Sequence, residues 1–458
     1  MKKLNFIIKY GLALLLLSFY SCESWLNVTP SDRLSEEMLF NDREGFVKAL
    51  NGVYIELNTN ELYGRNLTAG ALDVMGQYYS VASSSHAFYN YGGLVYTGND
   101  EKALFDNMWQ KCYAVIACCN TIIEKCDENK AGLSPVWRGS IKGEALALRA
   151  MLHFDMLRLF GPLTSELDKE SIPYQTNSDQ TVTPLLSGSE VVGLILDDLK
   201  NAVGLLKDTD PYFVEEEFSD TDLNYRRFRM NYFAAKGLMA RVQLWGGDKE
   251  KAAATAKEVI AEGQAEGAEF FPFVTNSEAT SSNPDRVFYS EVLFGTYHSS
   301  REKLHEDLFA PTLESTSILT LAGTARRDDL YDNENDYRYS VWSTYNKNGT
   351  SVLYHRKFEK QDNVTASRQY MIPLIRMSEM YLIAVECCKL DEASVYLNTF
   401  RNARNCNSLA LTEDNRINIL ANEYKKEMLG EGQLFFFYKR QEMVNIPDGN
   451  QATGTKNV

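Results

Sequence analysis

Apolar residues recur along most of this chain at spacings of three and four positions, which is the period of an amphipathic α-helix, and the strict alternation typical of strands is scarce. Start and stop signals accompany this period: Ser35 suits an N-cap, and Gly161-Pro162 ends one segment. The pattern predicts a mainly α-helical protein. The predicted helices cover residues 35–54, 109–126, 143–160, 189–206, 231–245, 249–262, 376–389, 392–405 and 416–429.

Two pairs of these segments predict helical hairpins. Residues 231–245 and 249–262 are joined by a tight turn at Gly246-Gly247-Asp248, and small alanines stand where the two helices would pack closely. This arrangement resembles one tetratricopeptide unit. Residues 376–389 and 392–405 predict a second hairpin with a shorter turn. We therefore expect a scaffold of tetratricopeptide-like helical hairpins.

Two long stretches break the helical pattern. Residues 63–100 are rich in Gly, Ser, Asn and Tyr, and residues 265–369 contain turn residues and isolated aromatics with no convincing period. Loops of such length inside a compact protein are uncommon and are usually functional. We expect the helices to form the scaffold and these two segments to form the ligand-facing surface.

The first residues are typical of an export signal. A basic start at Met1-Lys2-Lys3 is followed by an apolar run at 12–17, which is too short to span a bilayer, and by Cys22. We interpret residues 1–21 as a lipoprotein signal peptide and Cys22 as the lipidated N-terminus of the mature chain. The alternative is an ordinary signal in which Cys22 has no role. Residues 22–458 are then expected to form a single α-helical domain.

Composition narrows the classes of ligand. The 458 residues include 47 Lys and Arg against 62 Asp and Glu, a net charge of −15, which disfavours binding to nucleic-acid phosphates or to an anionic membrane surface. Aromatic residues make up 12% of the chain, with 26 Tyr. Together with Ser, Asn and Gly, they favour an adaptable surface for small polar ligands.

The cysteines after Cys22 do not form a metal or disulfide pattern. Cys112, Cys119 and Cys126 share one face of a predicted helix but are separated by about 10 Å along it, which exceeds the reach of a disulfide. The chain has no Cys-x-x-Cys motif. We predict buried free thiols that pack between helices.

Motifs for catalysis are absent from the sequence. It lacks His-Glu-x-x-His, Gly-x-Ser-x-Gly, Gly-x-Gly-x-x-Gly and the phosphate-binding loop, and its five histidines form no i, i+4 pair. The acidic stretches 208–222 and 328–336 lack the glycine of a calcium loop. We therefore predict a binding protein rather than an enzyme, with no catalytic residues, no metal and no cofactor.

Aromatic side chains are dense in the first irregular stretch and recur in the second. Flat rings stack on the apolar faces of sugars, while hydroxyl and amide groups bind the hydroxyls at the edges. For any single ring, packing inside the loop is the alternative, and the second set matters only if the fold brings the two segments together. The candidate ligand-binding residues are Tyr78, Tyr79, Tyr89, Tyr91, Tyr297, Trp342 and Tyr345.

Several motifs resemble, in order, those of the SusD/RagB-like outer-membrane lipoproteins, which serve nutrient uptake in Gram-negative bacteria. They lie in residues 22–30, 46–54, 109–123, 143–162, 372–384, 397–401 and 423–432. The connection before Glu392 is shorter than is usual in that family, and the C-terminus lacks the usual proline-rich tail. None of the ligand-facing residues matches a family motif, so the candidate residues rest on ring density alone.

The resemblance implies a surface-exposed protein, lipid-anchored to the outer membrane, that binds glycans without altering them. It also implies a partner, a SusC-like TonB-dependent outer-membrane barrel that receives the oligosaccharide. A peptide-binding member of the same family, a lipid-anchored helical glycoside hydrolase and a tetratricopeptide scaffold that binds only proteins are the alternatives.

Charged residues inside the family-like motifs have a structural interpretation. On helical faces this apolar, Glu144 with Arg149, Arg376 with Glu379, and Glu427 or Glu431 would be unsatisfied unless they pair between helices. We expect their loss to damage folding rather than ligand affinity.

Overall fold

A computed structural model describes residues 36–179, 181–267 and 270–458 of the chain. The predicted signal peptide and the predicted lipidation site at Cys22 lie outside the described residues. Among the described residues, no helix combines the length and the apolar character that crossing a bilayer requires.

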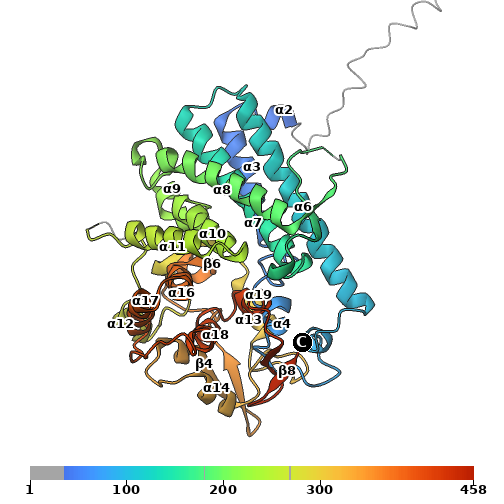
Figure 1. The fold of residues 1–458 in the computed structure, drawn as a ribbon, viewed down its shortest axis with the longest axis vertical. Helices are drawn as coiled ribbons and strands as arrows, with labels where there is room; N and C mark the ends of the chain where they lie inside the picture. Colours follow the sequence, from blue (N-terminus) through green and yellow to red (C-terminus); the bar gives the residue numbers. More distant parts are fainter. Residues whose placement is uncertain (1–35, 180, 268–269) are drawn as a thin grey trace, which may run out of the picture.

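Long helices stacked on one another form the upper half of the molecule in Figure 1. Packing follows chain order: α6 contacts α7, α7 contacts α8, α8 contacts α10, and α10 contacts α11. The helix α3 covers α6 and α7. The bounds are α3 (Arg43–Leu57), α6 (Asn99–Glu128), α7 (Pro135–Phe160), α8 (Gly188–Thr209), α10 (Tyr232–Trp245) and α11 (Lys249–Gly263).

A second group of helices continues this stack after the long irregular stretch. Its first member, α16, packs directly against α11, and α17 and α18 pack against α16. The two predicted hairpins are therefore neighbours in space, and the expected mainly helical, tetratricopeptide-like fold is confirmed. The bounds are α16 (Met377–Cys387), α17 (Leu390–Ala403), α18 (Arg416–Glu427) and α19 (Gln433–Arg440).

Local sequence signals explain where the helices begin and end. The hydroxyl of Ser134 accepts a hydrogen bond from the Trp137 amide at 3.3 Å, Pro135 occupies the first turn, and α7 ends before Gly161. Ser187 and Glu190 form a reciprocal capping box at the start of α8. The helix predicted at 35–54 is divided in the structure into α2 (Glu36–Leu39) and α3.

Short strands form only two-stranded sheets in the described part of the chain. The strand β3 (Val292–Tyr297) pairs with β6 (Met371–Arg376), and β4 (Trp342–Lys347) pairs with β5 (Thr350–His355). The other pairs are β1 (Glu170–Pro173) with β2 (Leu185–Ser187), and β7 (Asn445–Pro447) with β8 (Thr455–Asn457).

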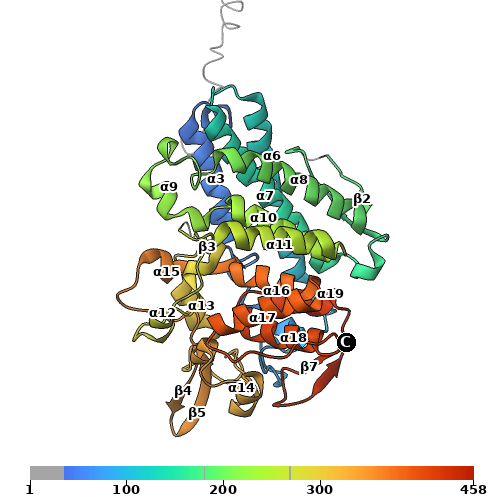
Figure 2. The ribbon, with the colours of Figure 1, turned by 60° about the vertical axis from the view of Figure 1, so that its left-hand side comes forward.

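The two stretches predicted as irregular contain short elements and pack against each other. The Ser80 amide donates to the Thr320 carbonyl at 2.7 Å, and a ring nitrogen of His86 lies 3.3 Å from the Ile318 carbonyl. This region, around β4 and α14, lies at the opposite end of the molecule from α2 (Figures 1 and 2). Its helices are α4 (Ala71–Met75), α5 (Tyr89–Gly92), α12 (Asn276–Thr280), α13 (Arg301–Leu308), α14 (Thr324–Leu330) and α15 (Ala366–Tyr370); a further short helix, α9 (Asp220–Asn224), lies before α10.

The prediction of buried free thiols is confirmed for most of the described cysteines and is wrong for Cys118. Those described are free thiols, and Cys112, Cys119 and Cys126 are buried. Burial raises the pKa of the Cys126 thiol to about 12, so it stays protonated and unreactive at neutral pH. Cys118 is exposed.

The charges singled out in the sequence are buried and paired, as expected, but their partners come from distant elements. Glu144 contacts Arg226 and Arg229. It does not pair with Arg149, which contacts Asp198 at 2.7 Å. Residues five positions apart point to different sides of a helix, so each side chain meets a different neighbour.

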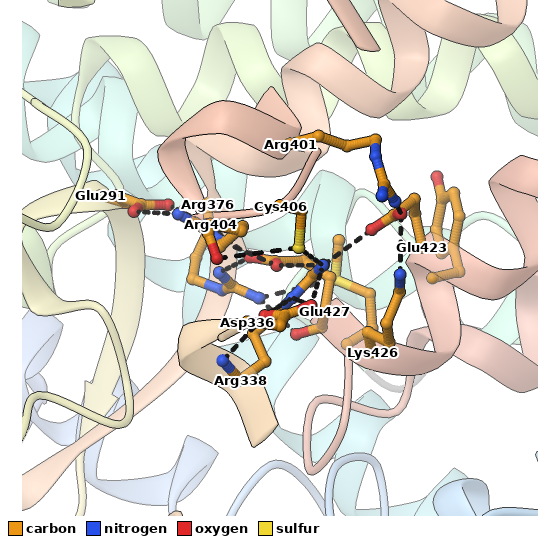
Figure 3. A network of polar contacts seen from close by, with 12 residues as sticks. Glu291, Asp336, Arg338, Arg376, Arg401, Arg404, Cys406, Glu423, Lys426 and Glu427 are labelled. Carbon is orange, nitrogen blue, oxygen red and sulfur yellow. Dashed lines mark hydrogen bonds and ion pairs between the residues drawn. The ribbon is translucent and has the colours of Figure 1, made fainter. Parts of the chain in front are cut away.

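Glu427 of α18 lies at the centre of the buried polar network shown in Figure 3. Its carboxylate contacts Arg376, Arg404 and Arg338, the last two at 2.7 and 3.1 Å. Burial alone would raise the pKa of Glu427, but the guanidiniums of Arg404 and Arg376 outweigh it and hold that pKa well below its ordinary value. The network joins α18 to β6 and to the end of α17. Its role is therefore structural.

Candidate functional site

An open hollow with a volume of about 870 Å³ lies between the two irregular segments. Ser80 comes from the first segment, while the loop at 313–324 and the β4–β5 hairpin come from the second. Its lining combines apolar side chains with seven hydroxyl groups. The hydroxyl groups belong to Ser80, Ser315, Thr320, Thr324, Thr344, Thr350 and Ser351.

Hydrogen bonds fix the walls of the hollow. The Thr320 hydroxyl donates to the Leu353 carbonyl at 2.6 Å, which ties the loop to β5. On the other side, the Lys347 ammonium donates to the Leu313 carbonyl at 3.0 Å and to Glu314 at 2.9 Å. The hollow therefore exists before a ligand binds, which reduces the entropy lost on binding.

A two-residue turn positions the hairpin that forms one wall. Asn348 and Gly349 have φ values of 52° and 87°, and the side chain of Asn346 accepts a hydrogen bond from the Gly349 amide at 2.7 Å. Asn-Gly is the preferred pair for such a turn. This dipeptide is a sequence signal for the hairpin, which periodicity alone did not predict.

Four of the predicted ligand-binding rings are buried in the core, which corrects the expectation that they present open faces. Tyr78, Tyr79, Tyr91 and Trp342 are only 3%, 1%, 5% and 5% exposed. The Tyr79 hydroxyl donates to Asp73 at 3.3 Å, and the Tyr78 hydroxyl donates to a backbone carbonyl. These rings belong to the main hydrophobic core of the molecule, so the alternative considered for them, packing inside the protein, is the one observed.

The remaining predicted rings lie at the surface but do not form one cluster. Tyr89 and Tyr345 are 42% and 44% exposed, and Tyr345 belongs to the β4 strand beside the hollow. Tyr297 is half-buried at the end of β3, where it contacts Phe228 and Tyr370 with ring centroids 5.2 Å apart in each case. Of the seven candidates, Tyr345 is thus the exposed one whose strand contributes to a wall of the hollow, through its neighbour Thr344.

A second, smaller cavity adjoins the hollow and shares Leu321 with it. Its volume is about 270 Å³, and its lining includes Tyr78, Arg326, Lys425 and Tyr438. Sequence analysis singled out Tyr78 for this region but none of the charged residues. Lys425 and Arg326 lie on different elements, so no sequence spacing could have joined them.

The hollow does not offer the chemistry of a glycosidase. Hydrolysis of a glycosidic bond by two carboxylates requires them about 5 to 9.5 Å apart. Glu314 is the single carboxylate in the described lining, and it is engaged by Lys347. In the described part of the chain, no group of three or more His, Cys, Asp or Glu residues is arranged to hold a metal ion.

Comparisons with known proteins match both halves of the chain. The family profile described as "Starch-binding associating with outer membrane" matches residues 24–244, and the "SusD family" profile matches residues 283–456. The curated "SusD-like protein P2" of Formosa agariphila is 25% identical over 265 residues, which are 56% of this chain and 46% of that protein. The match thus spans less than half the length of that relative.

Solved structures share the fold over nearly the whole chain. A SusD superfamily protein of Bacteroides thetaiotaomicron superposes with a TM-score of 0.69 at 21% identity, covering 89% of this chain and 90% of that one. A SusD-like carbohydrate-binding protein of Bacteroides vulgatus also gives 0.69, at 22% identity, covering 91% and 89%. At these identities the similarity concerns the fold.

Proposed function

This chain belongs to the SusD/RagB-like family, and from that premise we propose that it is a cell-surface lipoprotein that captures an oligosaccharide and delivers it to a SusC-like TonB-dependent outer-membrane barrel. The hydroxyl-lined hollow between the two irregular segments carries the proposal, because it suits a polyhydroxylated ligand. Its volume of about 870 Å³ also lies within the usual range for ligand sites, roughly 300 to 1,000 Å³.

Binding in the hollow is a reversible equilibrium without chemistry. Serine and threonine hydroxyls exchange hydrogen bonds with the sugar for hydrogen bonds with water, so each contributes about 0.5–1.5 kcal/mol. Tyr345, an exposed ring on the neighbouring strand β4, is the candidate for stacking on a bound sugar, which would contribute about as much. We expect dissociation constants of roughly micromolar to millimolar, or about −8 to −4 kcal/mol. Weak binding favours release into the barrel.

Membrane attachment and the barrel partner complete the proposal. Lipidation at Cys22 would bury acyl chains at about 0.8 kcal/mol per methylene, enough to hold an acidic protein on a membrane when several chains are present. Replacing Cys22 with Ser and fractionating the cells tests the anchor: the variant is expected in the soluble fraction. Co-purification with an outer-membrane barrel tests the partner.

Blocking the hollow tests the binding site. Ser351→Trp places a large ring in the hollow, whereas Ala254→Trp places one on the exposed face of α11 and serves as the matched control. In calorimetry with a panel of neutral and acidic oligosaccharides, we expect the wild type and Ala254→Trp to bind the same glycan and Ser351→Trp to lose it.

The same panel separates the alternatives. If only peptides give heat of binding, the ligand is a peptide and not a glycan. New reducing ends after incubation with polysaccharide would identify a hydrolase. Retention of a soluble protein partner without any response to small ligands would identify a protein-binding scaffold.

A further inference from the structure

The smaller cavity beside the hollow is closed by the C-terminal hairpin. Its walls come from α14, α18 and α19, and the turn at 452–454 between β7 and β8 covers it. Arg326 holds this cover in place, since its guanidinium donates to the carbonyls of Asp448 and Gln451 at 2.6 and 2.7 Å. We call this cavity the anion pocket.

Two cations line the anion pocket without a carboxylate partner. Among the described residues, neither Arg326 nor Lys425 has a carboxylate within ion-pair distance. The Lys425 ammonium contacts the amide oxygen of Asn422 at 3.1 Å. Its neighbour Lys426 faces the other way and pairs with Asp332 and Glu423 at 2.8 and 2.9 Å. Asp329 lines the same cavity without forming an ion pair with either cation in the described residues, so the charged side chains of the cavity keep a net positive charge. In a chain with an excess of acids, this net charge favours an anionic ligand.

An unsatisfied buried hydroxyl faces the same cavity. Tyr438 is only 4% exposed and lines the anion pocket, yet its hydroxyl has no hydrogen-bond partner in the part of the chain that the structure describes. A buried hydroxyl without a partner is costly, so such groups are normally hydrogen-bonded. An acceptor atom of a ligand in the pocket would satisfy it.

The size and the remaining walls limit the ligand to one ring. The volume of about 270 Å³ is near the lower limit for ligand sites, about 300 Å³. Tyr78 and Leu434 provide apolar surface, and Gln77 provides an amide. Leu321 lines both the pocket and the hollow, so the two cavities are neighbours.

We infer that the anion pocket binds one acidic sugar unit, with its carboxylate or sulfate ester between Lys425 and Arg326 and its ring against Tyr78. A ring or hydroxyl oxygen of the sugar accepts a hydrogen bond from Tyr438. The inference rests on the proposed glycan-binding function in naming a sugar as the ligand. It makes the cargo an acidic rather than a neutral glycan.

The ionisation of Lys425 agrees with this assignment. Burial and the nearby Arg326 lower the pKa of Lys425 to about 8. The ammonium therefore remains protonated at neutral pH in an environment that disfavours its charge. The negative charge of a bound anion would offset both the cost of burying the Lys425 ammonium and its repulsion by Arg326.

Calorimetry with single sugars tests the inference. Glucuronate and galacturonate carry the carboxylate, glucose 6-sulfate carries the sulfate ester, and glucose is the neutral control. We expect the acidic sugars to bind the wild type and glucose to give no heat. Comparing uronates with the sulfate distinguishes the two sources of negative charge.

Variants locate the binding in the pocket. Lys425→Met should weaken acidic-sugar binding about tenfold, because a charge-assisted contact is lost, whereas Lys425→Arg should retain it. Tyr438→Phe should weaken binding severalfold without altering thermal unfolding. The matched control is Lys200→Met, which removes a charge from the exposed face of α8.

The outcomes separate this inference from the proposed function. Three outcomes would overturn the proposed acidic-sugar site. They are equal binding of glucose and the acidic sugars, no binding of any of these sugars, and unchanged binding of acidic sugars by Lys425→Met. Ser351→Trp should abolish oligosaccharide binding in the hollow and leave binding of a single uronate intact. A protein that binds uronate but no oligosaccharide would refute the proposed function and leave the anion pocket standing.

Discussion

Arg241 in α10 and Glu379 in α16 form a bidentate ion pair, with both N–O distances at 2.6 Å, that joins the two helical hairpins across 138 positions of sequence. Both side chains are buried. The same guanidinium donates to the Leu374 carbonyl at 2.8 Å, so it also fixes the end of β6. The pair therefore connects the two halves of the helical stack.

Removing one partner of this pair should destabilise the fold. Glu379→Ala leaves the Arg241 charge buried without its partner, and we expect a loss of about 3–5 kcal/mol in the free energy of unfolding. Glu392→Ala breaks an exposed pair with Lys257 and should cost less than about 1 kcal/mol. Chemical denaturation measures both.

Ligand affinity distinguishes a structural from a functional role for Glu379. At temperatures where Glu379→Ala remains folded, we expect oligosaccharide binding to match the wild type, because this residue does not line the hollow. A variant with wild-type stability and lost ligand binding would contradict the assignment. Replacing Arg241 and Glu379 together by Met should recover much of the stability, since no unpaired charge remains.

Two helix glycines should respond in opposite directions to substitution by alanine. A Cβ at Gly143 in α7 would lie 2.8 Å from Leu206 of α8, whereas a Cβ at Gly193 would meet nothing within 4 Å. We expect Gly143→Ala to destabilise by about 1–3 kcal/mol through overpacking. Gly193→Ala should stabilise by about 0.5–1 kcal/mol through its better helix propensity. Thermal unfolding of both variants gives the comparison, and equal effects would exclude close approach of the helices at Gly143.

The sequence predicted the long helices well because their faces are periodic over several turns. It placed the start of α16 within one residue but did not predict β6, since Met371–Arg376 is buried throughout and an apolar run without alternation has no strand signature. It also missed α19, where Phe435, Phe436 and Phe437 are consecutive and show no helical period.

The candidate site was only partly predictable. Ring density indicated two segments, and the hydrogen bond between Ser80 and Thr320 shows that these segments meet. Density carries no information on which way a ring points, so Tyr79 proved to be core. The partner of a charge such as Glu144 depends on tertiary packing, which brings Arg226 to it from 82 positions away.

The Lys347 ammonium should position the wall of the hollow. It holds the β4–β5 hairpin to Leu313 and Glu314, so Lys347→Met is expected to weaken oligosaccharide binding severalfold and to speed amide exchange in residues 342–355. Lys303→Met, at an exposed i, i+4 pair with Asp307, is the control. Unchanged exchange in the hairpin together with weaker binding would instead indicate direct contact between Lys347 and the ligand.

The anion pocket should bind acidic sugars more weakly as the pH rises through about 8, where Lys425 loses its proton. The other groups near its ammonium are Arg326 and Asp329 on α14 and Lys426 on α18. Tyr438 on α19 does not titrate in this range, because burial raises its pKa. Calorimetry from pH 6.5 to 9.5 should therefore show falling affinity for the wild type and constant affinity for Lys425→Arg.

The free energy of unfolding should rise with pH over the range in which the affinity for acidic sugars falls. Unfolding therefore cannot explain the loss of affinity. The pKa of Lys425 in the folded state, about 8, lies below the ordinary lysine value of 10.5. Below pH 8 Lys425 is protonated in both the folded and the unfolded state, and the folded state bears the full cost of burying the charged ammonium. From pH 8 to 10.5 the unfolded state binds more protons than the folded state. This group therefore makes the fold more stable as the pH rises. Lys425→Met should thus be at least as stable as the wild type at pH 7 and lose that advantage near pH 10.5. A drop in its stability at pH 7 would show that the ammonium already has a stabilising partner in the fold.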